Sequence, residues 1–176
     1  MRNDARGLEP APTMAKPDRP ADPCVMVIFG AAGDLTKRKL VPAIANLAQS
    51  RLLPDQFAAI GVARDDLDAA RFRDKLMNDL SEFASCPLDA SVRDWVADRL
   101  FHVSGNLRDP ETFKAVSAEV DRLTKALQTG GNALFYLATP PDLFPESAVH
   151  LSAAGLTHED GFWRRVVFEK PFGHDL

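Results

Sequence analysis

Cysteine is scarce in this 176-residue sequence, and its scarcity excludes a fold held together by disulfides. Only Cys24 and Cys86 are present, which is too few for a disulfide framework, and their separation does not match the spacing of metal ligands. We interpret both as reduced thiols of a cytoplasmic protein and expect no bound metal. The sequence also has no apolar run long enough to span a bilayer, so we expect no membrane association.

An excess of positive charge is missing as well. The chain has 21 Lys and Arg residues against 25 Asp and Glu residues, a net charge of -4. This balance gives no general attraction to nucleic acids, and any site for an anion must be local. Hydrophobic residues make up 45% of the chain, which is ordinary for a globular protein.

The first 22 residues differ in composition from the rest. They are rich in proline and charge and lack the apolar centre of a signal peptide. Such a segment buries too little apolar surface to order itself, so we expect a flexible arm as far as about Asp22. Residues 23–176 are long enough for one domain with a core.

Beyond the arm, short apolar runs alternate with amphipathic segments. The runs predict strands at Cys24–Phe29, Phe57–Ala63, Leu100–Val103, Ala133–Ala138 and Val166–Phe168. The amphipathic segments predict helices at Leu40–Leu53, Leu67–Phe83, Ser91–Leu100, Pro110–Leu127 and Pro145–Ala154. This alternation predicts an α/β fold with a doubly wound, mostly parallel, Rossmann-like sheet. Ligands of such sheets bind beyond the carboxyl ends of the strands, here after Phe29, Ala63, Ala138 and Phe168.

A glycine turn follows the first predicted strand in the stretch VIFGAAGDLTKRKL. Gly30 and Gly33 allow backbone N–H groups to approach a diphosphate at the start of a helix. The full G-x-G-x-x-G pattern is not met, because Thr36 stands near the place of a third small residue. The alternatives are a nucleotide site and a plain turn from strand to helix.

Three cations follow this turn, where a helix should begin. Asp34 is interpreted as the helix N-cap. Lys37, Arg38 and Lys39 then lie near the positive end of the helix dipole, which disfavours them. Either they form a solvated charged face, or a bound phosphate compensates them.

The second strand ends in Arg64, followed by Asp65. An acid at this place would bind the ribose of NAD, whereas a guanidinium suits the 2′-phosphate of NADP. The order of the two residues favours NADP, and NAD remains an alternative. An exposed loop cation without a ligand is the remaining interpretation of Arg64.

Four segments together resemble one enzyme family. GAAGDLTKRKL, GVAR, LFYLATPP and VVFEKPFGHDL are similar to glucose-6-phosphate dehydrogenase, from about Val25 to Leu176. The resemblance implies oxidation of glucose 6-phosphate to 6-phosphogluconolactone with reduction of NADP, in the pentose phosphate pathway. It also implies NADP contacts from Gly30, Ala31, Ala32, Gly33, Asp34, Leu35, Thr36, Lys37, Arg64, Tyr136 and Lys170, and substrate contacts from Lys170 and Lys39.

The resemblance also implies that the family's catalytic histidine belongs to a second domain that follows the last motif. None of the four histidines of this chain matches it, so we assign no catalytic residue and expect little or no activity from the chain alone. Whether the chain is an enzyme by itself is left open. We therefore expect the NADP-binding domain of this enzyme, with a missing catalytic domain or chain as its partner. The alternatives are a stand-alone dinucleotide-binding module and an inactive fragment.

Overall fold

Five parallel strands form the centre of the computed structural model, which describes residues 19–64, 67–84 and 87–169. The strands are β1 (Cys24–Phe29), β2 (Phe57–Ala63), β3 (Leu100–Ser104), β4 (Ala133–Leu137) and β5 (Arg164–Phe168). Their order in the sheet is β3-β2-β1-β4-β5, and every neighbouring pair is parallel. The predicted Rossmann-like sheet is confirmed, and its order reverses between β1 and β4.

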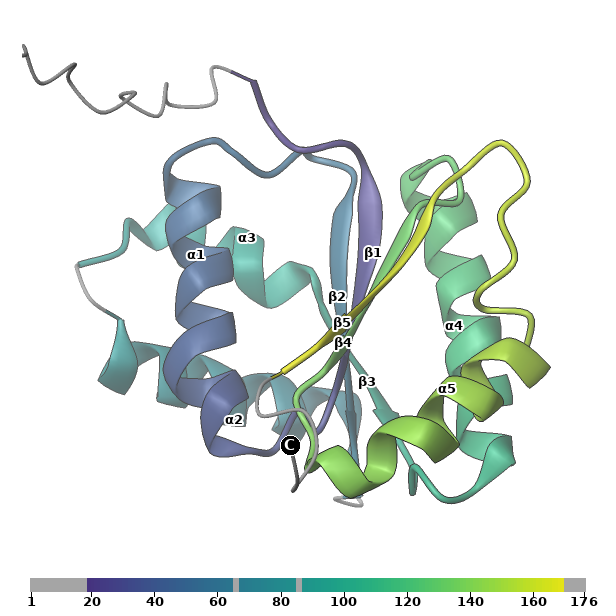
Figure 1. Ribbon diagram of the computed structural model, residues 1–176. Coiled ribbons are helices and arrows are strands. Elements are labelled where there is room, and N and C mark those ends of the chain that lie inside the picture. Colours follow the sequence, from purple (N-terminus) through teal and green to yellow (C-terminus); the bar gives the residue numbers. More distant parts are fainter. Residues whose placement is uncertain (1–18, 65–66, 85–86, 170–176) are drawn as a thin grey trace, which may run out of the picture.

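Helices cover both faces of this sheet (Figure 1). They are α1 (Val41–Gln49), α2 (Ala69–Phe83), α3 (Ala90–Asp98), α4 (Pro110–Leu127) and α5 (Phe144–Ala153), with a short 3-10 helix at Pro141–Leu143. Helices α1, α2 and α3 lie on one face, and α4 and α5 lie on the other. In the part of the chain that the structure describes, no helix is both long and apolar enough to cross a bilayer.

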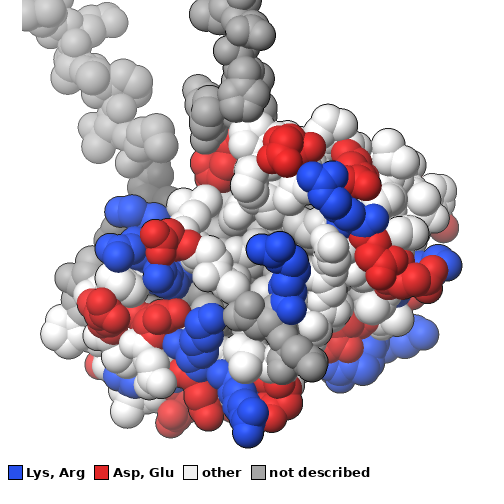
Figure 2. Space-filling view, turned by 90° about the horizontal axis from the view of Figure 1, so that it is seen from below, with Lys and Arg blue, Asp and Glu red and all other residues white. Residues whose placement is uncertain are grey.

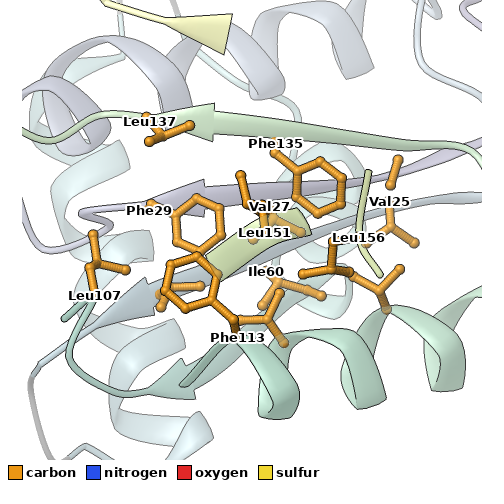
Figure 3. Packing of buried hydrophobic residues seen from close by; sticks show 14 of the residues in the cluster. Val25, Val27, Phe29, Ile60, Leu107, Phe113, Phe135, Leu137, Leu151 and Leu156 are labelled. Carbon is orange, nitrogen blue, oxygen red and sulfur yellow. The ribbon is translucent and has the colours of Figure 1, made fainter. Parts of the chain in front are cut away.

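The central strand β1 is buried on both faces, as its unbroken apolar run predicts. Val25, Val27 and Phe29 point into the core beneath α4 and α5, whereas the intervening residues point toward α1 and α2. On the α4 side the Phe29 ring stacks on Phe113, with 5.4 Å between ring centroids (Figure 3). Because β1 is packed on both faces, the position of its carboxyl end, where the glycine turn begins, is fixed in the sheet.

Several element boundaries differ from the sequence prediction. Helix α1 ends at Gln49 instead of Leu53, because Arg51 adopts a left-handed conformation with φ 55°. The Leu52 N–H then donates to the Leu47 carbonyl, which closes the helix end. The Ala21 N–H donates to the Leu52 carbonyl, whereas residues 1–18 of the predicted flexible arm lie outside the described residues. The other described bounds agree to within three residues.

Gly61 lets α2 pack closely against β2, next to the glycine turn. A Cβ at this position would lie 2.3 Å from Phe72 Cζ and 2.9 Å from Ala31 Cβ. We expect Gly61→Ala to lower the free energy of unfolding by about 1–3 kcal/mol through overpacking. Urea denaturation measures this loss. The loss caused by Gly61→Ala should be smaller in a Phe72→Leu background than in the unaltered chain, because the shorter side chain leaves room for the new methyl group. An unchanged unfolding midpoint in Gly61→Ala would contradict the close packing.

Candidate functional site

A cleft of about 530 Å³ lies at the carboxyl edge of the sheet, where the strand order reverses. Four loops line it: Gly30, Ala32 and Gly33 after β1; residues 62–64 at the end of β2; residues 105–108 after β3; and residues 138–140, 142 and 143 after β4. Figure 2 looks onto this edge and shows Lys and Arg side chains interspersed with Asp and Glu. The predicted positions after Phe29, Ala63 and Ala138 therefore meet in one place.

The glycine turn is built so that β1 passes directly beneath the loop after β4. Gly30 has φ 86°, and a Cβ there would lie 2.5 Å from the Ala138 carbonyl oxygen. The N–H groups of Gly30 and Ala31 both donate to the Val62 carbonyl, at 3.0 Å each, and the Gly33 N–H donates to the Gly30 carbonyl. These three amides hold the turn and are occupied.

The amides of Ala32, Asp34, Leu35 and Thr36 are left without a backbone acceptor, and Thr36 is the buried residue among them. No backbone carbonyl within the described residues accepts a hydrogen bond from them, as expected for the first N–H groups of a helix. The side chains of Ala32 and Asp34 are exposed. Free amides at the positive end of a helix are suited to an anion such as a diphosphate.

Thr36 lies near the position of the third glycine in the G-x-G-x-x-G pattern. Its side chain is fully buried, and its hydroxyl donates to the Gly30 carbonyl at 3.4 Å. Thr36 therefore lies behind the turn and supports it from the protein interior. Ala31 is also buried, and its methyl group lies against Gly61.

Two of the three cations after the turn, Lys37 and Arg38, have partners inside the protein. The Lys37 ammonium lies 2.7 Å from the Asp34 carboxylate, and the Arg38 guanidinium stacks over the Phe83 ring at 4.6 Å. The hydrogen bond from Lys37, followed by its charge, lowers the pKa of Asp34. These contacts favour a solvated charged face for Lys37 and Arg38. Lys39 is exposed and does not line the cleft.

The prediction of Asp34 as the helix N-cap is wrong. The Lys37 N–H donates to the Gly33 carbonyl at 3.3 Å, so Gly33 is the cap residue and Asp34 lies in the first turn. The first helical turn thus begins one residue earlier than an N-cap at Asp34 would place it. The next turn, Thr36–Leu40, is a π-helix in which the Val41 N–H reaches the Thr36 carbonyl. Pro42 follows, and the wider turn relieves the clash between its ring and the preceding carbonyls.

Arg64 lies at the exposed end of β2 and lines the cleft. Among the described residues, no carboxylate forms an ion pair with it. Its guanidinium is therefore available to an anionic group of a ligand. Asp65, which left the choice between NADP and NAD open, lies outside the described residues.

Seven predicted contacts do not line this cleft, and one cannot be placed; the seven are Ala31, Asp34, Leu35, Thr36, Lys37, Lys39 and Tyr136. Tyr136 lies on β4, packs against the α1 side of the core, and its hydroxyl donates to the Glu169 carboxylate. Leu35 is half-buried beside the turn and does not line the cleft. Lys170 lies outside the described residues. The roles of these eight residues stay predictions.

The loop after β3 belongs to the cleft and was not predicted. Its Gly105 N–H donates to the Ala63 carbonyl, and a Cβ on Gly105 would lie 2.4 Å from the Thr112 hydroxyl. That hydroxyl donates to the Asn106 carbonyl at 2.9 Å. The sequence could have indicated this loop, because ligands of parallel sheets bind beyond the carboxyl ends of strands and Ser104 ends such a strand.

Two of the three described histidines, His102 and His150, have structural contacts. His102 stacks on Phe72, with 4.1 Å between ring centroids, and its Nδ1 lies 3.1 Å from the Leu67 carbonyl. His150 contacts the Phe113 ring edge, and its Nδ1 lies 3.3 Å from the Leu107 carbonyl. No histidine of the described residues lines the cleft.

The parallel sheet, its order and the glycine turn at the reversal point define a dinucleotide-binding domain. The sequence profile described as "Glucose-6-phosphate dehydrogenase, NAD binding domain" matches residues 27–176. The chain belongs to this family, and the resemblance drawn from its motifs is confirmed.

Relatives from several bacteria are similar over most of this chain. Glucose-6-phosphate 1-dehydrogenase 2 of Mycobacterium tuberculosis is 40% identical over 159 residues, which cover 90% of this chain and 31% of the relative. Glucose-6-phosphate 1-dehydrogenase of Chlamydia muridarum is 39% identical, covering 88% and 31%. The chain thus spans less than a third of the length of these curated relatives.

Solved structures agree with the fold. A glucose-6-phosphate dehydrogenase in complex with its substrate glucose-6-phosphate superposes with a TM-score of 0.77 at 27% identity, over 88% of this chain and 31% of the other. Glucose-6-phosphate 1-dehydrogenase from Mycobacterium avium gives a TM-score of 0.73 at 31% identity, over 89% and 31%.

Proposed function

We propose that the chain binds NADP as the coenzyme domain of a glucose-6-phosphate dehydrogenase. One observation carries the proposal: Ala32 and Arg64 line the same cleft, at the ends of neighbouring strands. The amides of Ala32, Asp34 and Leu35 lack a backbone acceptor among the described residues, and Arg64 has no ion pair with a described carboxylate. The amides of Ala32, Asp34 and Leu35 would bind the diphosphate. Arg64 would bind the 2′-phosphate with two parallel hydrogen bonds.

The remaining contacts of the proposal come from the family resemblance. Tyr136 is assigned to the nicotinamide half of the coenzyme, Lys170 to coenzyme and substrate, and Lys39 to the substrate. A solved relative is described as a complex with glucose-6-phosphate, and we assign the same substrate to the protein to which this domain belongs. Bound NADP would supply the acceptor for the hydride from the sugar.

The described residues would bind and orient the coenzyme, but no histidine among them lines the cleft to act as the general base. A positioned base typically contributes about 10²–10⁴-fold to such a reaction. The curated relatives are about three times longer than this chain, and we propose that a further domain or chain supplies the base and the sugar pocket. A cytoplasmic location also belongs to the proposal. The free thiol of Cys24 is what a reducing compartment would leave.

Titration calorimetry tests the binding step with the 176-residue chain. We expect saturable binding of NADP, weaker binding of NAD, and no detectable NADPH formation when glucose 6-phosphate is added. An absence of heat with both coenzymes at millimolar concentration would contradict the proposed function. NADPH formation that depends on glucose 6-phosphate would contradict the assignment of the base to another domain.

A further inference from the structure

Arg108 joins two walls of the cleft that belong to different loops. It follows β3, and its guanidinium contacts two carboxylates beyond β4: Asp142 at 3.4 Å and Glu146 at 3.1 Å. Arg108 and Asp142 both line the cleft, and Glu146 lies in the first turn of α5. Arg108 and Asp142 therefore place charged groups in the wall of the cleft, and Glu146 adjoins them to complete a cluster of three charged side chains.

The backbone of Arg108 is held without this ion pair. Its N–H donates to the Asn106 side chain at 3.1 Å, and the next residue's N–H donates to the Asn106 carbonyl. Leu107 is buried in the core, 8% exposed. The three charged side chains of the cluster are by contrast 59%, 62% and 37% exposed. Ion pairs with this exposure contribute little to stability, so the role of the cluster lies elsewhere.

The cluster places one cation against two carboxylates at a site for a polyanion. A carboxylate repels phosphate groups over several ångströms, and a neighbouring guanidinium cancels most of this repulsion. Without Arg108, the Asp142 carboxylate at the cleft wall and the adjoining Glu146 carboxylate would be two uncompensated negative charges close to the coenzyme. The nearby Arg64 would then act against them, and the affinity for any phosphorylated ligand would fall.

We propose that Arg108 is an affinity-determining residue that shields the phosphates of the bound dinucleotide from Asp142 and Glu146. This inference rests on the proposed function, because it needs a polyanion in the cleft. Two alternative roles of Arg108 would give different results from shielding. In a mechanical role, the ion pair would hold the two walls together; in a direct role, Arg108 would itself bind a phosphate.

A set of three variants separates these roles by titration calorimetry with NADP. We expect Arg108→Gln to weaken binding about 3- to 10-fold, the size typical of one partly screened charge. Asp142→Asn combined with Glu146→Gln should strengthen binding by a similar factor. The triple variant should bind at least as tightly as the unaltered chain. Each shift should shrink when the salt concentration is raised to about 0.5 M.

Arg122→Gln is the matched control, because Arg122 pairs with Glu119 on α4 and does not line the cleft. It should leave the NADP affinity unchanged. Weaker binding in all three cluster variants would overturn shielding in favour of the mechanical role. A triple variant as weak as Arg108→Gln would overturn it in favour of direct contact, and equal affinities throughout would also overturn it. Failure of the unaltered chain to bind NADP would instead reject the proposed function.

Discussion

Replacing Gly30 by alanine should cost the protein both stability and its coenzyme site. The new Cβ would lie 2.5 Å from the Ala138 carbonyl oxygen and 3.1 Å from its carbon. Because these are backbone atoms at the end of β4, the clash cannot be relieved by a side-chain rotation. The positive φ adds about 1–2 kcal/mol and overpacking about 1–3 kcal/mol. We expect an unfolding free energy about 2–5 kcal/mol lower, measured by urea denaturation.

Binding should fall with it, because the displaced turn no longer presents its amides together. We expect NADP affinity to drop more than about tenfold, which corresponds to about 1.4 kcal/mol. Gly130→Ala is the matched control, since Gly130 has φ 71° but nothing within 4 Å of its Cβ position. Gly130→Ala should lower the free energy of unfolding only by the cost of the positive φ, and its affinity for NADP should be unchanged. Equal destabilisation by the two substitutions would show that the close approach of β1 and β4 is absent.

Arg64→Gln should change the choice of coenzyme more than the stability. A charge-assisted hydrogen bond contributes about 1.5–3 kcal/mol, so NADP affinity should fall about 10- to 100-fold. NAD lacks the 2′-phosphate, and its affinity should change less than about twofold. Calorimetric titration of both coenzymes against the variant measures the difference.

Arg71→Gln provides the control for a general loss of positive charge. Arg71 is an exposed cation on α2 that pairs with Asp68 and does not line the cleft. It should reduce the affinity for both coenzymes slightly and equally. If Arg64→Gln also weakened NADP and NAD by the same factor, its guanidinium would not be the group that distinguishes them.

The fold could be predicted from the sequence because short segments show the apolar runs of buried strands and the helical spacing of apolar residues. The unbroken apolar run Cys24–Phe29 fits a strand covered on both faces, and β1 has that position. Asp109 and Pro110 mark the start of α4, where the Asp109 carboxylate accepts the Glu111 N–H at 3.0 Å. Helix ends were harder to predict, since a left-handed residue such as Arg51 leaves no pattern in composition.

The site was predicted only in part, because its details depend on contacts between distant segments. Gly30, Gly33 and Arg64 could be identified from their places after predicted strands. Which amides are occupied could not, because the acceptor for two of them is the Val62 carbonyl on the neighbouring strand. The pairing of Arg108 with Asp142 likewise joins residues 34 positions apart.

Amide chemical shifts during a titration with NADP test the central claim most directly, namely that the free amides of the glycine turn bind the coenzyme's diphosphate. In the ¹⁵N-labelled chain, the largest saturable shifts should fall on Ala32, Asp34 and Leu35, with smaller ones on the residues after β2 and β3. Binding that leaves these three amides unshifted, while residues elsewhere respond, would contradict the account.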